Sequence, residues 1–518
     1  MIKTLFQGSS SACFEIQNHS PYYSPEEYTV RLDGREVYHG HENVFSVFEL
    51  KPDTEYELNV RFSETEETLS FRTESENCCI NVRSFGAVGD GVHADTAAIQ
   101  TAINMIPEKG RLYFPEGTYL TLPLTLRSHI TIELSENAVL LGSTDRERYP
   151  IIPAIIEDAY GKEIPFAGFE GIEQDAYQSL IQGSYVNDVQ IVGKGRIDGN
   201  GQNGDWWKKF NEFPAKRPRA VFLNRCSNIT LHGVTVANSP SWHIHPYFSK
   251  NISLLNCSVS APKVSPNTDA IDPESCDYVD IIGCKFSVGD DCIAVKSGKI
   301  DMAMKYHVPA DHHTIRNCLM QFGHGALTLG SELSAGIRNV SVTQCFFRET
   351  DRGLRIKSRR GRGKESIITD VLFDNIRMDK VKTPIVINMW YNCVDPDRFT
   401  EYVWSREHLP IDDRTPHLGL FEFKNMECTD AEVAACYIDG LPESPIDRVE
   451  LENVSVSFAT DAKPGVPAMQ NFAEERCRLG IYLDNVKEIS VKNVRLSGVV
   501  GESLIADHYE KITTEGFE

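Results

Sequence analysis

A short phrase that recurs through most of the chain restricts the fold more than any other feature of the sequence. Its clearest copies are Asn228-Ile-Thr-Leu-His-Gly-Val234, Asn251-Ile-Ser-Leu-Leu-Asn-Cys257 and Tyr278-Val-Asp-Ile-Ile-Gly-Cys284. Positions two, four and seven are mostly apolar, and position six is usually Asn or Gly. The copies start at 228, 251 and 278, which are spacings of 23 and 27 residues. A period in this range, combined with strand-like alternation, indicates a solenoid.

The solenoid is predicted to be built from strands, because long segments with a 3.6-residue period are missing. We therefore expect an all-β chain whose main part is a right-handed parallel β-helix, in which equivalent positions of successive coils stack. Several copies of the phrase end in cysteine. Stacking then predicts one internal ladder of buried, reduced thiols at Cys257, Cys284, Cys318 and Cys345.

The chain is predicted to contain two domains, residues 1–76 and 77–518. The first has short alternating strands and an Asp33-Gly34 hairpin signal. The stretch from Leu50 to Val60 resembles the fibronectin type III pattern, in which a tyrosine such as Tyr56 forms a corner of a small β-sandwich. This domain is either a sugar-binding module or a spacer, and the spacer is favoured because no aromatic platform stands out.

The solenoid is expected to begin near Asn81 and to carry a helix over 97–106, capped by Asp95 or Thr96. Such a helix would cover the open end of the stack and protect its edge strands. The spacing between copies varies because loops are inserted on one face, where solenoids usually build their binding sites. The candidate insertions are 150–185, 299–311, 391–418 and 458–478.

Charge and hydropathy limit the possible partners of the protein. The 518 residues include 52 Lys and Arg against 74 Asp and Glu, a formal charge of −22, which speaks against nucleic acid. No run of 18 apolar residues occurs, so no membrane span is predicted. The start, Met1 to Gly8, lacks a long apolar stretch and does not read as a secretory signal. We therefore expect a cytoplasmic protein.

Four phrases on consecutive coils carry the chemistry: Asn267-Thr-Asp269, Gly289-Asp-Asp291, Gly323-His-Gly325 and Arg355-Ile-Lys357. Taken singly, each is usually a turn or a solvated strand face. Stacking would bring three carboxylates, one histidine and two cations into a single cleft. Clustered acids cannot all stay ionised, so at least one pKa should rise, as general acid catalysis requires. The cations suit an acidic substrate, since Arg and Lys pair with carboxylates.

In this order, the four phrases resemble glycoside hydrolase family 28, the polygalacturonases, over roughly residues 80 to 500. Arg217-Pro218, Asn238-Ser-Pro-Ser-Trp242 and Asp198-Gly-Asn-Gly201 match the style of the family. One departure is Ala270, where the family usually has glycine. The resemblance implies hydrolysis of α-1,4 bonds between galacturonate residues of pectin-derived oligosaccharides, without a cofactor or a metal ion.

The resemblance also implies catalytic roles. Asp290 is similar to the general acid that protonates the glycosidic oxygen, and Asp269 and Asp291 resemble the pair that activates the attacking water. His324 resembles the residue that tunes the protonation of the acid. Single displacement with inversion would place the carboxyl groups about 6.5–9.5 Å apart. Because neighbours on a strand face opposite ways, Asp290 and Asp291 must lie in a turn or bulge, which Gly289 would allow.

Substrate-binding roles follow in the same way. Arg355 and Lys357 resemble the residues that hold a galacturonate carboxylate near the scissile bond. Tyr391, 34 residues after Lys357, matches a substrate-contacting tyrosine of the family. Asp272 is expected to orient a turn. The basic run from Arg355 to Lys364 favours a polyuronate, although such runs are often merely solvated.

Three alternatives remain open from the sequence. The first keeps the fold and changes the substrate to rhamnogalacturonan or xylogalacturonan. The second is a pectate lyase, which would use calcium held by acidic residues, and the third is a non-catalytic carbohydrate-binding solenoid. The combined Asp, His and Arg-x-Lys set fits hydrolysis better than either of the last two.

The mode of action is predicted to be exo-cleavage of short galacturonate chains. The insertions at 150–185, 299–311 and 391–418 are long enough to wall off one end of the cleft. The phrase Gly330-Ser-Glu-Leu-Ser-Ala-Gly336 also resembles bacterial exo-acting members of the family. The expected partner is thus an oligogalacturonide, and the sequence predicts no oligomeric state.

Overall fold

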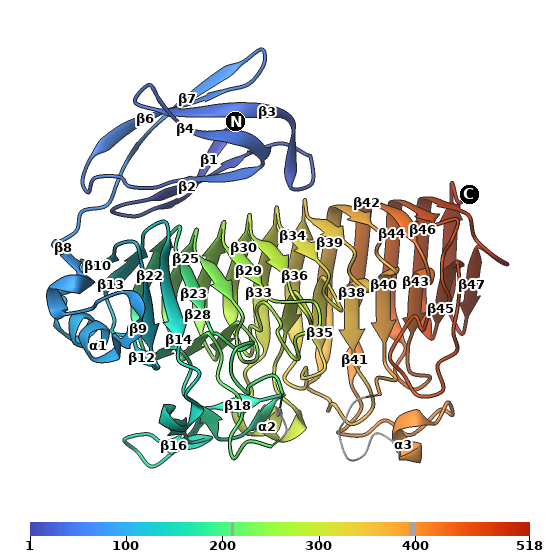
Figure 1. The fold of residues 1–518 in the computed structure, drawn as a ribbon. Helices are drawn as coiled ribbons and strands as arrows, with labels where there is room; N and C mark the ends of the chain where they lie inside the picture. Colours follow the sequence, from blue (N-terminus) through green and yellow to red (C-terminus); the bar gives the residue numbers. More distant parts are fainter. Residues whose placement is uncertain (209–211, 393–399) are drawn as a thin grey trace.

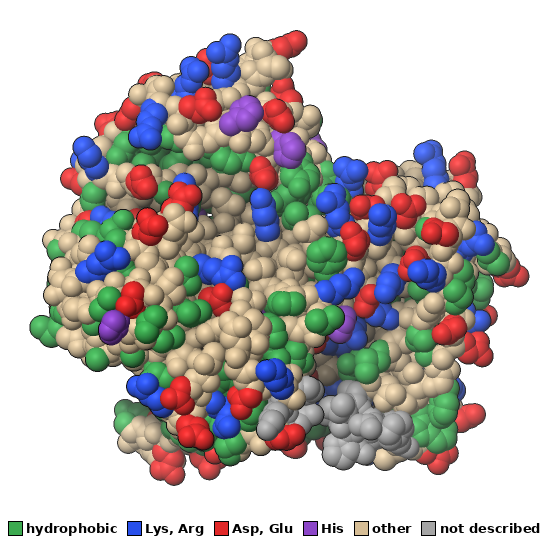
Figure 2. All heavy atoms as spheres, viewed as in Figure 1, with side chains coloured by type: hydrophobic (Ala, Val, Ile, Leu, Met, Phe, Trp, Pro, Cys, Tyr) green, Lys and Arg blue, Asp and Glu red, His purple; other side chains and the backbone are tan. Residues whose placement is uncertain are grey.

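The computed structural model describes residues 1–208, 212–392 and 400–518 of a chain that is almost entirely β (Figure 1). A small N-terminal domain lies along one side of a long solenoid, and the inserted loops lie on the opposite side. None of the helices in these ranges is both long and apolar enough to cross a membrane. On the face seen in Figure 2, acidic and basic side chains are interspersed, so the negative net charge is not gathered into one patch there.

The N-terminal domain is a sandwich of two antiparallel sheets. One sheet has the order β1 (Ile2–Gln7), β2 (Ala12–Ile16), β5 (Val44–Val47), and the other has the order β4 (Arg35–Glu42), β3 (Tyr23–Leu32), β6 (Glu55–Arg61), β7 (Glu66–Arg72). Phe14, Phe45 and Val60 pack together between the sheets. The Asp33-Gly34 turn joins β3 to β4, as predicted. The hydroxyl of Tyr56 accepts a 2.8 Å hydrogen bond from the backbone N–H of Lys51, five residues upstream.

The solenoid is a parallel β-helix, as the repeat predicted. Its longest sheet runs from β8 (Cys78–Asn81) and β10 (Gly110–Phe114) to β48 (Lys511–Glu515). The recurring phrase forms one strand of each coil in this sheet. These strands are β25 (Ser227–His232), β28 (Lys250–Leu255), β30 (Asp277–Ile282), β33 (Ala310–Arg316), β36 (Ile337–Thr343), β39 (Ile367–Asp379), β42 (Leu420–Ala431), β44 (Ile446–Phe458) and β46 (Val486–Ser497).

A second row of strands faces the inserted loops and carries the site described below. It consists of β12 (Leu124–Thr125), β21 (Ile181–Ser184), β24 (Val221–Asn224) and β27 (Ile244–Tyr247), followed by β32 (Ile293–Val295), β35 (Leu327–Gly330), β38 (Arg352–Lys357), β40 (Thr383–Asn388), β43 (Ala434–Asp439), β45 (Leu479–Asp484) and β47 (Leu504–Asp507). Ile271 bridges β27 to β32 and makes the row continuous.

Position six of the phrase is Asn or Gly because the backbone turns there in the left-handed region. Its φ angle is +76° at Gly233, +50° at Asn256 and +70° at Gly283. Asn and Gly adopt this conformation at the least cost. The N-terminal domain docks on the same row of turns: Ser46 accepts a hydrogen bond from Asn256, and the side chain of Asn43 donates to Asn317.

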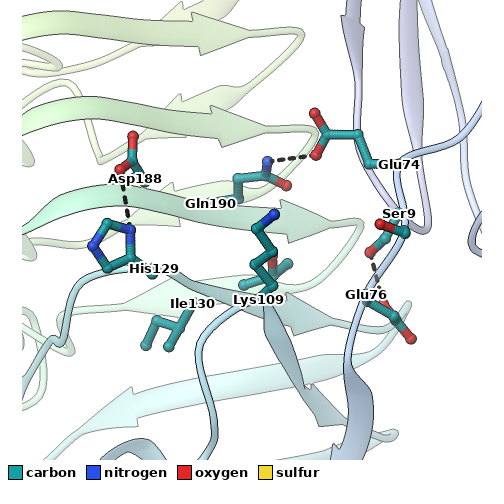
Figure 3. A pocket seen from close by; sticks show the side chains of 10 residues that line it. Ser9, Glu74, Glu76, Lys109, His129, Ile130, Asp188 and Gln190 are labelled. Carbon is teal, nitrogen blue, oxygen red and sulfur yellow. Dashed lines mark hydrogen bonds and ion pairs between the residues drawn. The ribbon is translucent and has the colours of Figure 1, made fainter.

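The linker after β7 is anchored to the first coils of the solenoid. Figure 3 shows Glu74 bonded to Gln190 of an early coil across a polar crevice, with Glu76 bonded to Ser9 beside it. Glu76 pairs with Arg111 at 2.8 Å, and Glu74 accepts a hydrogen bond from Gln190. Both charges of the Glu76–Arg111 pair are largely shielded from solvent, so removal of Arg111 would leave the Glu76 carboxylate partly buried without its cation.

The predicted thiol ladder is present inside the solenoid. Cys257, Cys284, Cys318 and Cys345 are all buried and unpaired. Each thiol donates to a backbone carbonyl of the preceding coil, for example Cys284 to Leu254 at 3.4 Å. Burial raises the pKa of the Cys284 and Cys345 thiols well above the ordinary value, so they stay protonated.

A helix covers the open end of the stack, as expected. It is α1 (Thr96–Met105), and its buried face, Ile99, Ala102 and Ile103, joins the solenoid core. Asp95 occupies the N-cap position, but its carboxylate accepts hydrogen bonds from the backbone of Val88 and Gly89 and makes no cap bond. The side chain therefore ties the preceding loop to the helix.

The insertions gather on the side of the second row of strands (Figure 1). Residues 150–185 form small hairpins from β15 (Ile151–Ile152), β16 (Ile155–Glu157), β17 (Glu163–Pro165), β18 (Gly168–Phe169), β19 (Ile172–Glu173) and β20 (Ala176–Tyr177). Two others contain the short helices α2 (Ile300–Tyr306) and α3 (Glu401–Trp404). Residues 393–399 of the expected insertion 391–418 lie outside the described residues.

Candidate active site

The floor of the site is the outer face of the second row of strands. Along β38, Leu354 and Ile356 point into the core, so Arg355 and Lys357 point outward on the same face. Parallel pairing places Arg355 beside Thr328 of β35. The alternation in Leu-Arg-Ile-Lys thus explains why both cations reach the cleft.

The carboxylates come from bends that precede this row. Asp290 and Asp291 lie between β31 (Lys285–Ser287) and β32, outside any strand, which confirms the turn that their side chains require. Gly289 permits this bend by close approach: an added Cβ would lie 2.6 Å from the carbonyl oxygen of Ser265 on the preceding coil. Any side chain at position 289 would therefore displace the loop that carries Asp269.

Backbone hydrogen bonds stack the four phrases coil upon coil. The N–H of Ala270 donates to the carbonyl of Asp291, and the N–H of Cys292 donates to the carbonyl of Gly325. The methyl group of Ala270 is buried in the solenoid core, so the departure from glycine is accommodated there. The four phrases are therefore neighbours, as predicted.

Asp291 is held by both cations. Its Oδ1 lies 3.2 Å from Nη1 of Arg355, and its Oδ2 lies 3.0 Å from Nζ of Lys357. Burial alone would raise the pKa of Asp291, but Lys357 and Arg355 outweigh burial and lower this pKa well below its ordinary value. Asp291 is thus a carboxylate at neutral pH.

Asp269 has the opposite environment. Its side chain is buried and its Oδ1 has no hydrogen-bond partner among the described residues. Burial, followed by the charges of Asp272 and Asp290, raises the pKa of Asp269 well above its ordinary value. A raised pKa was expected for at least one of the clustered acids, and Asp269 has one, although burial contributes more to it than the neighbouring acids do.

The carboxylates converge in the cleft. An oxygen of Asp269, one of Asp290 and one of Asp291 all lie within 4.8 Å of one another; the separation of about 6.5–9.5 Å expected for inversion applies to whole carboxyl groups and stays a prediction. Asp269 lies one coil before Asp290 and Asp291, and the stacking of consecutive coils brings the two bends together. A water molecule between two oxygens at this distance can still hydrogen-bond to both, since each such bond spans about 2.7–2.8 Å.

His324 lies beside Asp290, as predicted. Its Nδ1 is 3.3 Å from Oδ1 of Asp290, and this contact raises the pKa of the imidazole. The imidazole is half exposed, so it faces the open part of the cleft. The pair is therefore placed to share a proton within reach of a substrate.

Tyr391 also lines the cleft, beyond β40. Its ring centroid is 5.8 Å from Nζ of Lys357, and its backbone pairs with Gln470 of the insertion 458–478. Met469 of the same insertion lines the cleft and contacts Arg355 through its sulfur. The cavity enclosed by these residues has a volume of about 310 Å³.

Several lining residues were missed in the sequence. Lys296 is almost fully buried and pairs with Asp272 at 3.3 Å and Glu332 at 3.1 Å, while its Nζ lies 4.8 Å from the Trp242 ring centroid. The carboxylate of Asp272 therefore pairs with Lys296. Burial raises the pKa of Asp272 to about 7, although the positive charge of Lys296 acts to lower this pKa. Ile293 and Val295 point into the core, so the alternation of side chains along the strand could have placed Lys296 on the outer face.

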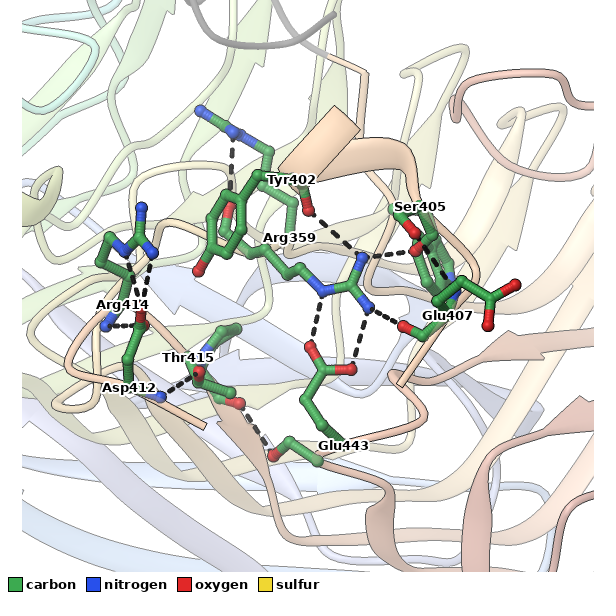
Figure 4. Close-up of polar contacts among 12 residues, drawn as sticks. Arg359, Tyr402, Ser405, Glu407, Asp412, Arg414, Thr415 and Glu443 are labelled. Carbon is green, nitrogen blue, oxygen red and sulfur yellow. Dashed lines mark hydrogen bonds and ion pairs between the residues drawn. The ribbon is translucent and has the colours of Figure 1, made fainter. Parts of the chain in front are cut away.

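The basic run does not form one substrate patch. Arg355 and Lys357 line the cleft, but Arg360 is fully buried and forms a bidentate ion pair with Glu443. Arg360 also donates to the backbone carbonyls of Ser405 and Glu407, and Figure 4 shows this network joining α3 to Glu443. Lys364 is exposed and pairs with Asp413. The rest of the run thus supports the loops around the cleft.

The three acids are close enough to hold a cation, but their surroundings do not favour one. Both oxygens of Asp291 are occupied by Arg355 and Lys357, and Asp269 has a raised pKa. A calcium ion needs six to eight oxygen ligands and would sit against two fixed positive charges. The three carboxylates are therefore poorly suited to bind the calcium ion that a pectate lyase would use.

These features define a glycoside hydrolase built on a parallel β-helix. The family model "Glycosyl hydrolases family 28" matches residues 161–475, and the chain belongs to this family. A second model, "Rhamnogalacturonase A/epimerase, pectate lyase-like", matches residues 79–152, the first coils of the solenoid.

Relatives and solved structures agree with this assignment. A probable polygalacturonase of Vitis vinifera is 33% identical over 394 residues, which cover 73% of this chain and 74% of the relative. An exo-poly-alpha-D-galacturonosidase of Dickeya chrysanthemi is 28% identical over 397 residues, covering 66% and 63% of the two chains. The family 28 exopolygalacturonase of Yersinia enterocolitica has the same fold over 99% of this chain and 98% of its own, with a TM-score of 0.72 and 20% identity. The exopolygalacturonase of Thermotoga maritima gives a TM-score of 0.65 at 26% identity, covering 81% and 92%.

Proposed function

We propose that this protein hydrolyses α-1,4 bonds between galacturonate residues from a chain end, by single displacement with inversion. The observation that carries the proposal is the convergence of Asp269, Asp290 and Asp291 on a cleft whose floor presents Arg355 and Lys357. Three acids serve glycoside hydrolysis, and the two cations serve a substrate that carries a carboxylate.

In this mechanism Asp290 donates a proton to the glycosidic oxygen. The Nδ1 atom of His324 lies 3.3 Å from Oδ1 of Asp290. The imidazole holds the proton that it shares with Asp290 in place, and it stabilises the negative charge that forms on Asp290 when the acid gives up its proton. A water molecule bound between Asp291 and Asp269 attacks the anomeric carbon from the other side. Asp291, kept ionised by its two cations, accepts the proton of this water.

Arg355 and Lys357 bind the galacturonate carboxylate next to the scissile bond, and Tyr391 contacts the sugar from the side of β40. In the free protein both cations face Asp291, so their charge is already oriented toward the reacting centre.

Exo-action is supported by the relatives and by two of the insertions expected to wall off one end of the cleft, 150–185 and 299–311; the third, 391–418, begins at Tyr391 after β40, at the other end of the row. The Dickeya chrysanthemi relative and the Thermotoga maritima structure are both named as exo-acting enzymes. In this chain the hairpin β18–β19 and residue Lys299, which precedes α2, reach the cleft at one end. A polymer that extended past this end would meet the hairpin.

The test compares viscosity of polygalacturonate with released reducing ends. Exo-cleavage gives a slow fall in viscosity, with mono- or digalacturonate as the only early product, whereas a sharp fall at low conversion would contradict it. Parallel assays with rhamnogalacturonan and xylogalacturonan test the alternative substrates. Unaltered activity in EDTA and no rise in absorbance from unsaturated products separate hydrolysis from calcium-dependent elimination.

For the N-terminal domain we propose a fibronectin type III-like module that acts as a spacer and clamp. Its sheet order and the Tyr56 contact support the likeness, and its position away from the loops supports the role. We also propose a cytoplasmic location, supported by the many buried unpaired thiols, and fractionation of the native host tests it.

A further inference from the structure

One end of the cleft is closed by the tip of the hairpin β18–β19. The two-residue turn Glu170-Gly171 is seated firmly, because the carbonyl of Gly171 accepts a 3.0 Å hydrogen bond from the N–H of Lys299. An added Cβ at Gly171 would lie 2.6 Å from that nitrogen and 2.7 Å from Cγ of Glu332. Next to the turn, Phe169 stacks on Trp242 with a centroid distance of 4.7 Å.

The cleft runs along the solenoid axis, with this hairpin at the end nearer the N-terminus. Trp242 precedes β27, Asp290 precedes β32 and Tyr391 follows β40, and these strands follow one another in a single row. Phe169, stacked on Trp242, therefore lies at the opposite end from Tyr391. The acids lie between the two ends.

Glu170 lines this closed end, and its carboxylate has no hydrogen bond or ion pair with any described residue. It is mostly removed from solvent, and burial together with the charge of Glu332 raises its pKa, against the effect of Lys299 and Lys296. A partly desolvated carboxylate without a partner is costly, and a donor from a ligand would relieve that cost.

We infer that Glu170 is a specificity-determining residue that accepts a hydrogen bond from the free hydroxyl of a galacturonate chain end. This inference rests on the proposed function. A chain end carries an O–H group where an internal residue carries a glycosidic oxygen, which has no hydrogen. An ionised carboxylate only accepts hydrogen bonds, so it binds the first and is left unpaired by the second.

The hydrogen bond to Glu170 distinguishes a chain end from an internal residue, in addition to the steric obstruction by the hairpin. Sites built to hydrogen-bond a substrate hydroxyl reject analogues that lack it strongly, because the buried polar group is then left unpaired. A further galacturonate would also bring a second negative charge toward Glu170 and Glu332, which disfavours an internal segment of the polymer.

The experiment uses trigalacturonates altered at one end only. A trimer with a 4,5-unsaturated residue at its non-reducing end lacks the 4-hydroxyl and is no larger than the natural sugar, and a methyl glycoside blocks the reducing end. We expect the wild-type protein to cleave one of the two with kcat/KM at least about 100-fold below that of the unmodified trimer. Which trimer is rejected identifies the end that Glu170 contacts.

Glu170→Gln preserves the volume of the side chain and adds an N–H donor, so the rejection should fall to about tenfold or less. On the unmodified trimer we expect about a tenfold loss in kcat/KM, carried mainly by KM. Glu173→Gln is the matched control on the same hairpin. Glu173 pairs with Lys305 and Tyr306 and does not belong to the cleft lining, so this variant should keep full discrimination.

Equal cleavage of all three trimers by the wild-type protein, or full rejection by Glu170→Gln, would overturn the inference alone. Failure to cleave the unmodified trimer would overturn the proposed function and this inference with it. Glu170→Asp, which withdraws the carboxylate by one methylene, is the second variant if Glu170→Gln does not fold, and it should lose discrimination in the same direction.

Discussion

The Nζ atom of Lys357 lies 3.0 Å from Oδ2 of Asp291, so a cation expected to bind substrate also holds the Asp291 carboxylate in its ionised form. The same lysine therefore has two effects that one substitution removes together. Its loss weakens the binding of a galacturonate carboxylate, and it also lets burial raise the pKa of Asp291.

Lys357→Met should change both KM and the pH profile. Asp291 must be ionised to accept a proton, and Lys357 lowers its pKa, so removing the lysine moves the acidic limb of kcat/KM to higher pH. KM should rise about tenfold or more, since hydrogen bonds to charged groups contribute about 1.5–3 kcal/mol. Lys364→Met, an exposed lysine of the same run, is the control. An unshifted acidic limb would contradict the role of Lys357 as partner of Asp291.

Asp290→Asn should lower turnover by about 100-fold or more, because the amide cannot donate the proton that the leaving oxygen needs. Steady-state kinetics on trigalacturonate measures the loss, and thermal unfolding shows that the fold is intact. Asp280→Asn, on the exposed face of β30, should behave as the wild-type protein. A folded Asp290→Asn variant with near-normal turnover would remove Asp290 from the role of acid.

Hydrolysis should invert the anomeric configuration. Both oxygens of Asp291 face cations, and the pKa of Asp269 is raised, so neither group is a good nucleophile and water attacks instead. Proton NMR of the first product should show the β anomer from an α-linked substrate. Initial release of the α anomer would mean a covalent intermediate.

The four ladder thiols should resist modification in the native protein. Cys257, Cys284, Cys318 and Cys345 are buried and donate to carbonyls, so a thiol reagent reaches them only after unfolding. Cys79 is exposed and provides an internal control that the reagent reaches in the native protein. Mass spectrometry after brief labelling distinguishes the sites, and rapid labelling of all four ladder thiols would disprove the ladder.

Arg360→Ala should destabilise the protein by about 3–5 kcal/mol, because it leaves Glu443 buried without its partner. The loop around α3 also loses its bonds to the Arg360 guanidinium. The unfolding midpoint in urea measures the effect. Lys364→Ala removes an exposed pair and should change stability by less than about 0.5 kcal/mol. Equal midpoints for the two variants would show that the buried pair contributes nothing.

The solenoid and the four phrases could be predicted from sequence because both are properties of the repeat. Position six keeps Asn or Gly for its left-handed turn, and the alternation around Arg355 and Lys357 puts both on one face. Once coils are assumed to stack, the neighbours of Asp291 follow from the register. The separation of the whole carboxyl groups stays a prediction, whereas the convergence of one oxygen from each acid is shown.

The closed end of the cleft could not be predicted in the same way. Glu170 lies in an insertion that has no counterpart in other coils, so no periodicity reports where its side chain points. The partners of Arg360 are likewise set by loops, since Glu443, Ser405 and Glu407 come from separate connections. The basic composition of the run from Arg355 to Lys364 suggested substrate binding throughout, but Arg360 is buried in an ion pair and has a structural role.

Because the cleft follows the solenoid axis, distances along the cleft are set by the spacing between coils. Neighbouring parallel strands are about 4.8 Å apart, so the two steps from β27 through Ile271 to β32 set Trp242, on which Phe169 of the hairpin stacks, about 10 Å along the axis from the coil of Asp290. The distance between the pocket at Glu170, where the chain end would bind, and the bond that is cut can therefore change only in steps of one coil. A change in the length of the released product would require moving the hairpin by a coil or rebuilding its tip, and point substitutions on the floor would leave it unchanged.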